Sequence, residues 1–294
     1  MDKYLETLGK YDINLNDEEI KAEVQQIIAE NYEANNTEDV LKFSLGCIDL
    51  TTLNPTDNEE RVREFTQKVN EFEELYPELD NVASICVYPN FAEVVSMNLD
   101  VTEVDTTVVS AGFPSSQTFD EIKVAECALA VSKGADEVDI VINVGQFLQG
   151  QYEEMCDTIT ECKEACRGKI FKVILETGAL KSASNIMKAS VLAIYAGADF
   201  IKTSTGKLEP AATPEAVLVM CKAAKAYFEQ TGVRIGIKVA GGVRTPEDAV
   251  KYYSIVKAVL GEEWLTKDLY RIGASSAANN LLSAIVGKSV KHFL

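Results

Sequence analysis

The sequence predicts an α/β protein that folds as a closed (β/α)8 TIM barrel with an N-terminal helical extension. Eight short runs of apolar and β-branched residues recur along the chain, as is typical of buried parallel strands. Segments with helical periodicity separate the runs. The chain has 294 residues, enough for one barrel of about 250 residues and an extension.

The runs are separated by about 24 to 36 residues, which leaves room for one helix and two loops between successive strands. They lie near residues 47–51, 82–88, 106–113, 138–144, 171–176, 200–204, 235–240 and 270–274. Between the first two runs, residues 57–76 have apolar side chains at three- and four-residue spacing, which predicts an amphipathic helix.

Capping patterns indicate where later helices begin. The helix expected over residues 118–132 starts with the capping pair Thr118 and Glu121. Its expected core-facing stripe consists of Ile122, Ala125, Ala128 and Leu129. Thr213 and Thr245 each precede a proline, which is the order expected for an N-cap residue followed by proline at the first helical position.

The first part of the chain has no strand pattern of the barrel type. We expect residues 1–40 to form the helical extension, with an amphipathic helix over residues 17–30, and residues 41–294 to form the barrel. A doubly wound open sheet is the alternative architecture. It usually shows a phosphate loop such as GxGxxG after its first strand, and none follows residues 47–51.

Composition and charge restrict the class of partner. The formal net charge is −18, which argues against nucleic acid and acidic membranes as partners. No segment approaches the roughly 18 consecutive apolar residues of a membrane span. The first twenty residues also lack the pattern of a secretory signal. These features predict a soluble, cytoplasmic protein.

Cysteine and histidine content limits the chemistry. The seven scattered cysteines are an odd number, which predicts reduced thiols. Cys162 and Cys166 are four residues apart and could share a helix face, but a zinc site needs further ligands, so we expect no metal. His292 is the only histidine, which argues against Ser-His and Cys-His mechanisms.

Four charged residues interrupt the expected strands: Asp49, Asp139, Lys202 and Lys238. A charge inside a buried parallel strand is costly unless it is paired or used. If Lys202 and Lys238 both point into the barrel, burial and mutual repulsion lower a lysine pKa and give the neutral amine that a Schiff base requires. The alternative is that each lysine points outward and extends its ammonium group into solvent.

Strand alternation places Asp139 on the same face as Val141 and Asn143. A carboxylate beside an ammonium group in the barrel interior can relay protons. The alternative for Asp139 is a structural ion pair with an inward-facing lysine. Cys86, in the second run, is a candidate pocket residue, although core packing explains a thiol there equally well.

Two turns rich in small residues follow the last two expected strands. Residues 240–244 and 273–276 lie where phosphate is usually bound in such barrels, and their small side chains let backbone N–H groups approach an anion. The candidate phosphate residues in these turns are Gly241, Gly242, Arg244, Gly273, Ser275 and Ser276. The alternative is a pair of ordinary tight turns and an N-cap.

Taken together, these motifs resemble the deoxyribose-phosphate aldolase family. The matching segments are residues 49–54, 85–89, 134–139, 176–178, 198–207, 238–244 and 270–276. The resemblance implies a metal- and cofactor-free class I aldolase on a (β/α)8 barrel. The implied reaction is the reversible cleavage of 2-deoxyribose 5-phosphate to acetaldehyde and glyceraldehyde 3-phosphate, usually in deoxyribonucleoside breakdown.

The resemblance also implies residue roles. Lys202 would form the Schiff base, Lys238 would lower its pKa and transfer protons, and Asp139 would shuttle protons with Lys238. Asp49, Thr205 and Lys207 would orient the sugar hydroxyl groups and the phosphate end. Leu53 and Cys86 would surround the acetaldehyde-sized donor. Gly206 would bind the phosphate together with the residues of the two turns. Because dimers are common in the family, the resemblance also implies a homodimer. The sequence itself shows no interface.

The sequence departs from some relatives at its C-terminus, where residues 291–294 contain no terminal tyrosine to assist proton transfer. Two other functions stay open from the sequence. One is a Schiff-base aldolase or transaldolase that acts on another donor. The other is a barrel that binds a sugar phosphate without catalysis, although the pair Lys202 and Lys238 has no purpose in simple binding.

Overall fold

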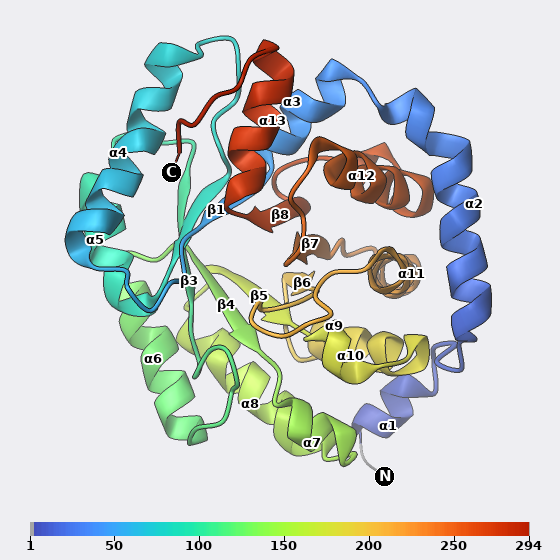
Figure 1. Cartoon of the computed structure of the whole chain (residues 1–294). Coiled ribbons are helices and arrows are strands. Elements are labelled where there is room, and N and C mark those ends of the chain that lie inside the picture. The colour runs from blue at the N-terminus through green and yellow to red at the C-terminus, as the bar shows by residue number, and fades with distance from the viewer. Residues whose placement is uncertain (1–2, 294) are drawn as a thin grey trace.

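The computed structural model describes residues 3–293 as a closed barrel of eight parallel strands, in which each strand pairs with the next and β8 pairs with β1 (Figure 1). The strands are β1 (Ile48–Thr51), β2 (Ser84–Val87), β3 (Asp105–Val109), β4 (Glu137–Val141), β5 (Ile170–Ile174), β6 (Phe200–Lys202), β7 (Gly236–Ala240) and β8 (Tyr270–Ala274). The barrel and all eight predicted strands are therefore confirmed, with ends that differ by a few residues.

Helices surround the ring of strands (Figure 1). They are α1 (Lys3–Leu8), α2 (Asp17–Asn35), α3 (Glu38–Gly46), α4 (Glu59–Leu75), α5 (Ala92–Asn98), α6 (Asp120–Ser132), α7 (Val144–Leu148), α8 (Tyr152–Ala165), α9 (Thr177–Leu180), α10 (Ala183–Tyr195), α11 (Pro214–Thr231), α12 (Pro246–Leu260) and α13 (Ser276–Val286), with 3₁₀ turns η1 (Pro89–Phe91) and η2 (Glu262–Trp264). Parallel strands require such crossover connections, which explains the regular alternation.

The N-terminal segment wraps the outside of the barrel. Helix α1 packs on α8 and α10, and the long α2 packs on α11 and α12 (Figure 1). Helix α2 continues to Asn35, beyond the predicted end at residue 30. Residue 40, the predicted boundary of the extension, lies inside α3.

Of the three helix starts predicted from capping patterns, two are confirmed and one is wrong. Thr213 and Thr245 each accept a backbone hydrogen bond as N-cap residues before a proline. Helix α6, in contrast, begins at Asp120 after Phe119, with no side-chain cap. The predicted capping pair at Thr118 is therefore not formed.

The predicted buried stripe of α6 is also wrong. Ile122 and Leu129 are exposed, while Lys123, Cys127 and Ala130 face the protein. The buried set has the same three- and four-residue spacing, so both faces of this helix fit a helical period. The side chains that face the barrel include a lysine and a cysteine, so a search for a stripe of apolar residues does not find this face.

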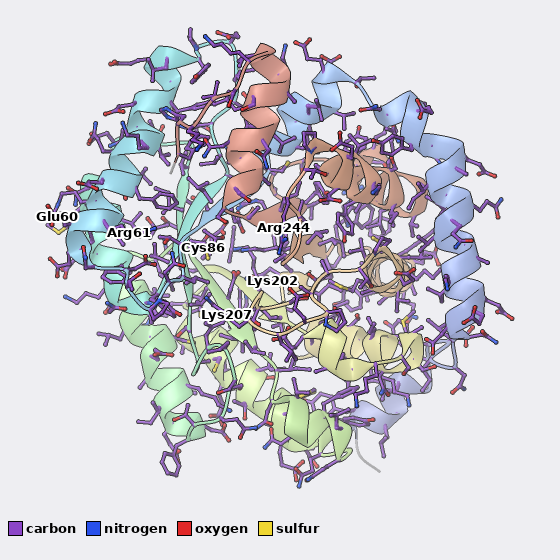
Figure 2. All side chains as sticks on the ribbon, in the orientation of Figure 1. Glu60, Arg61, Cys86, Lys202, Lys207 and Arg244 are labelled. Carbon is purple, nitrogen blue, oxygen red and sulfur yellow. The ribbon has the colours of Figure 1, made fainter. Side chains whose placement is uncertain are left out.

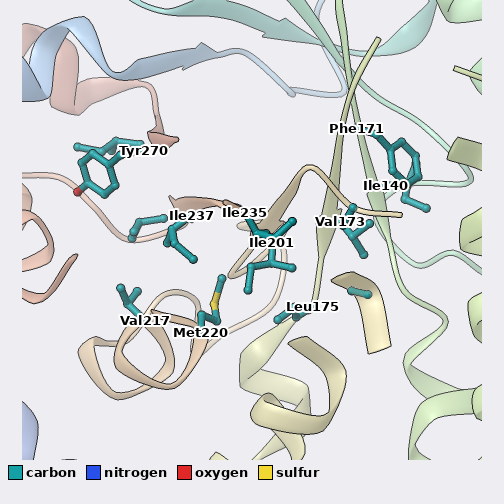
Figure 3. Close-up of a cluster of buried hydrophobic side chains, with 14 of the residues drawn as sticks. Ile140, Phe171, Val173, Leu175, Ile201, Val217, Met220, Ile235, Ile237 and Tyr270 are labelled. Carbon is teal, nitrogen blue, oxygen red and sulfur yellow. The ribbon is translucent and has the colours of Figure 1, made fainter. Parts of the chain in front are cut away.

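Strand alternation separates the core from the interior of the barrel. Ile201 and Ile237 point outward and pack with Val217 and Met220 of α11 in the main hydrophobic cluster (Figure 3). Because successive strand side chains point to opposite faces, the residues beside them, including Lys202, point into the barrel.

Candidate active site

The interior of the barrel contains a cluster of buried charges. We call the following seven side chains, each at most 4% exposed, the inner charge cluster: Asp49, Glu137, Asp139, Lys172, Lys202, Lys238 and Arg271. They come from β1, β4, β5, β6, β7 and β8. Such a set is stable only if every charge is paired, so its contacts decide what each group can do.

Asp139 joins the two predicted lysines. Its Oδ2 atom accepts hydrogen bonds from Lys202 Nζ at 2.8 Å and from Lys238 Nζ at 2.7 Å. Lys202 and Lys238 are also register partners on the neighbouring strands β6 and β7. Both lysines therefore point inward, and the alternative of outward-pointing side chains is excluded.

The two lysines differ in pKa. Burial lowers the pKa of Lys202, and the charge of Lys238 adds to this effect against the opposing charge of Asp139. Burial also disfavours the charged form of Lys238, but Asp139 and Asp49 outweigh it, and the pKa of Lys238 is raised. Lys202 is thus the lysine that can lose its proton, whereas Lys238 stays an ammonium group.

The pKa of Asp139 is held well below its ordinary value. Burial disfavours its charge, but the positive charges of Lys172, Lys202 and Lys238 outweigh burial. Asp139 is consequently an ionised acceptor placed between the two lysines. Such a carboxylate can accept a proton from one neighbour and return it to another.

Three members of the cluster were not predicted from the sequence. Lys172 donates to Asp139 Oδ1 at 3.1 Å and forms an ion pair with Glu137. Arg271 donates to Asp49 Oδ1 at 2.6 Å and to Glu137 Oε1 at 2.9 Å. The criterion of a charge inside a strand also applies to Lys172 and Arg271, so a stricter use of it would have found them.

The deeper end of the cluster reaches the opposite rim of the barrel. Glu137 accepts a hydrogen bond from Thr107 Oγ1 at 2.5 Å, and Asp105 lies 3.8 Å from the Arg271 guanidinium group. Burial, together with the charge of Glu137, raises the pKa of the partly exposed Asp105 to about 6. The cluster is therefore supported by polar groups from β3 below the lysines.

The charge count of the cluster agrees with the lowered pKa of Lys202. Four members are basic and three are carboxylates, so the cluster carries one excess positive charge when every group is ionised. Loss of the proton from Lys202 leaves three positive and three negative charges. Since an unbalanced buried charge is costly, this balance favours the neutral amine.

A cavity of about 320 Å³ opens above Lys202, at the C-terminal ends of the strands. Its lining residues are Thr51, Thr52, Leu53, Asn54, Arg61, Lys202, Thr205, Gly206, Lys207, Ala240, Gly241, Gly242, Val243, Arg244, Gly273, Ala274, Ser275 and Ser276. They include four basic side chains and no carboxylate, in a chain with a net charge of −18. The cavity is therefore suited to an anion.

The predicted phosphate residues all line this cavity. Gly241 has a φ of +84°, and a Cβ atom there would lie 2.6 Å from the Cβ of Ala211 and 3.3 Å from the Cα of Gly206. Glycine at position 241 therefore permits both the left-handed backbone and the close approach of the loop after β6. Ser275 and Ser276 complete this wall at the start of α13.

The predicted substrate residues divide into two groups. Leu53, Thr205 and Lys207 line the cavity, and Lys207 Nζ donates to the Leu53 carbonyl at 2.5 Å. Asp49 and Cys86 do not line it, because both side chains are fully buried beneath its floor. Asp49 instead pairs with Lys238, which places it behind the lysines and out of reach of a ligand in the cavity.

Further residues line the cavity for which no role was predicted from the sequence. Thr51 is the last residue of β1, Thr52 and Asn54 follow the strand, and Arg61 extends from the first turn of α4 (Figure 2). Thr51, Thr52 and Asn54 belong to the family-like segment 49–54, but no role was predicted for them. Arg61 lies outside every matching segment, so no sequence motif indicates that it belongs to a site. Thr205 is fixed by Glu176, which accepts from its backbone N and its hydroxyl group at 3.1 and 2.6 Å.

No group of three or more His, Cys, Asp and Glu side chains within residues 3–293 is arranged to hold a metal ion. Cys162 and Cys166 are buried free thiols that lie close to Cys127, a third free thiol on α6. Over the same residues, no helix is both long enough and apolar enough to cross a membrane.

Comparison with known proteins identifies the family. The model of the DeoC/LacD family aldolases matches residues 43–275, which is most of the chain. The chain is 39% identical to the deoxyribose-phosphate aldolase of Mus musculus over 249 residues, covering 80% of this chain and 77% of the mouse protein. It is also 39% identical to the Homo sapiens enzyme of that name over 244 residues, with 80% and 77% covered.

A solved structure supports the same assignment. The tetrameric deoxyribose phosphate aldolase from Aeropyrum pernix superimposes with a TM-score of 0.64 and 25% identity, covering 89% of this chain and 96% of the archaeal chain. The barrel, the match over residues 43–275 and the identity to the mammalian proteins agree. The chain therefore belongs to the DeoC/LacD family of aldolases and is a carbon–carbon lyase.

Proposed function

We propose that this enzyme reversibly cleaves 2-deoxy-D-ribose 5-phosphate to acetaldehyde and D-glyceraldehyde 3-phosphate through a Schiff base on Lys202. The observation that carries the proposal is the position of Lys202. It is the one member of the inner charge cluster that lines the cavity. Of the three lysines in the cluster, it is the one whose pKa is lowered. The names of the mammalian relatives support the choice of substrate.

The first step needs the neutral amine of Lys202. This amine attacks the C1 aldehyde of the open-chain sugar, and loss of water gives a protonated imine. The positive imine nitrogen then accepts the electron pair of the C2–C3 bond as that bond breaks. The proton of the C3 hydroxyl group leaves at the same time, so C3 becomes the aldehyde carbon of glyceraldehyde 3-phosphate.

The remaining two carbons stay on Lys202 as a neutral enamine. Protonation of the enamine carbon and hydrolysis of the resulting imine release acetaldehyde and restore the amine. We assign the proton transfers to Asp139 and Lys238, because Asp139 Oδ2 is within 2.8 Å of both lysine nitrogens. In this role Lys238 is the acid and Asp139 the shuttle, with the raised pKa of Lys238 keeping the acid charged at neutral pH.

The charge of the cavity supports a phosphorylated substrate. Lys207 and Arg244 lie on its wall with the glycine turns, and no carboxylate lines it (Figure 2). Backbone N–H groups at the start of α13 add a favourable helix dipole for an anion. We therefore assign the phosphate to the wall formed by the loops after β6, β7 and β8.

We further propose that the enzyme acts in deoxyribonucleoside breakdown in the cytoplasm. The seven cysteines are all free and buried, which suits a reducing compartment. A homodimer is also proposed, and analytical ultracentrifugation would distinguish it from a monomer and from a tetramer such as that of the Aeropyrum pernix protein.

Borohydride trapping tests the covalent step. The protein is incubated with 2-deoxyribose 5-phosphate, reduced, and analysed by peptide mass mapping. We expect an adduct on Lys202 that is absent from Lys202→Ala and retained in Lys169→Ala, a partly exposed lysine outside the cavity. An adduct on Lys238 would reverse the two lysine roles, and a folded protein without any adduct would contradict the proposed reaction.

A further inference from the structure

We propose that Arg61 determines specificity for the phosphorylated end of the substrate, acting from the β1–α4 side of the cavity. This inference rests on the function proposed above and extends it to a residue outside the sequence motifs. It separates recognition of the anion from the chemistry at Lys202. Arg61 lines the cavity from α4, a helix that contributes no member of the inner charge cluster (Figure 2).

The guanidinium group of Arg61 is held on one side only. Its Nε atom forms an ion pair with Asp57 Oδ1 at 3.3 Å. Asp57 is itself fixed, since its Oδ2 atom accepts from Thr52 Oγ1 at 2.8 Å and from the Asn54 backbone N at 2.9 Å. The side chain of Asp57 is only 1% exposed, so this anchor is built into the loop after β1.

The same arrangement leaves the two outer nitrogens of Arg61 available. Neither has a hydrogen-bond or ion-pair partner within residues 3–293, and the side chain is 48% exposed. An arginine held through Nε presents its two Nη atoms as a planar pair, the geometry that binds phosphate oxygens in a bidentate manner. Preorganisation of this kind improves binding, because less side-chain freedom is lost with the ligand.

The other cations of the cavity leave a role for Arg61. Lys202 is reserved for the aldehyde, and the Lys207 ammonium group already donates to the Leu53 carbonyl. The remaining cations are two guanidinium groups, Arg61 on the α4 side and Arg244 after β7 (Figure 2). No carboxylate lines the cavity, and the Asp57 carboxylate that pairs with Arg61 contacts only its Nε atom. A phosphate dianion can therefore be approached from two sides.

The test compares Arg61→Gln with Arg63→Gln, which makes the same charge change at an exposed position of α4 outside the cavity. We expect Arg61→Gln to raise KM for 2-deoxyribose 5-phosphate about tenfold with kcat unchanged, since it removes binding common to ground and transition states. The kcat/KM for unphosphorylated 2-deoxyribose should stay at the wild-type value, as should all constants of Arg63→Gln. Arg61→Lys should recover part of the lost affinity.

An equal loss on both sugars, or equal effects of Arg61→Gln and Arg63→Gln, would overturn the assignment. Binding of inorganic phosphate, measured by calorimetry, separates this proposal from the proposed reaction. Wild-type protein that fails to cleave 2-deoxyribose 5-phosphate refutes the reaction alone. Weaker phosphate binding by Arg61→Gln than by Arg63→Gln would still support the role of Arg61, and equal binding would refute it.

Discussion

Replacing Asp139 with asparagine is the most informative perturbation of the inner charge cluster. The side chains have nearly the same shape, but asparagine removes the charge that three ammonium groups share. In the protein, Asp139 contacts Lys202 at 2.8 Å, Lys238 at 2.7 Å and Lys172 at 3.1 Å. The variant therefore tests electrostatics with little change in packing.

The expected magnitudes follow from these contacts. Removing one partner of a buried ion pair costs about 3–5 kcal/mol in the free energy of unfolding. The Asp139 carboxylate also raises the pKa of Lys202, so its loss lowers that pKa further and leaves more neutral amine at a given pH. Loss of the proton shuttle should reduce turnover by about 10²- to 10⁴-fold.

Two assays separate these effects. Urea denaturation measures the change in stability, with Asp136→Asn as a control, because the partly exposed Asp136 pairs with Lys169. Borohydride trapping as a function of pH measures the neutral amine, and the variant's trapping curve should move to lower pH while its turnover falls. A curve that moves to higher pH, or turnover close to that of the wild-type enzyme, would refute the assigned roles of Asp139.

Two further predictions concern packing and acid stability. A Cβ atom at Gly273 would lie 2.8 Å from the Cβ of Ala240 and 3.1 Å from the Cε of Lys238. Gly273→Ala should therefore lower the free energy of unfolding by about 1–3 kcal/mol and reduce kcat by displacing Lys238. An unchanged urea midpoint and an unchanged kcat would contradict this prediction. Asp49 and Asp139 have pKa values held below their ordinary range by neighbouring cations against the cost of burial. Their stabilisation is therefore complete above the unfolded pKa of about 4 and is lost as the pH falls from there toward the lowered pKa of the folded state. Urea midpoints should consequently drop between pH 5 and pH 3 and not between pH 7 and pH 5.

Sequence patterns predicted the barrel well, because eight buried strands leave a strong periodic signal. They also predicted Lys202, Lys238 and Asp139 as a group, since each charge interrupts an apolar run. They could not predict how the charges pair. That pairing depends on the closure of the sheet, which brings Arg271 of β8 onto Asp49 and Glu137.

The errors have physical causes. The prediction of a capping pair at Thr118 was wrong because the helix begins later, after Phe119, and no side chain caps it there. The prediction that Ile122 and Leu129 are buried was wrong because apolar residues also occur on the exposed face of α6. Arg61 gave no signal at all, since its position in the cavity depends on the path of the loop after β1.

The ion pairs of Arg271 have a consequence for how the chain folds. This residue lies on the last strand, yet it neutralises carboxylates of the first and fourth strands. A nascent chain that ends before β8 would have to bury Asp49 and Glu137 without this cation. Premature closure of a partial barrel is thereby penalised, and the arrival of β8 both completes the sheet and balances its interior. The barrel is consequently expected to assemble as one cooperative unit once β8 has been synthesised, and not by stepwise addition of finished halves.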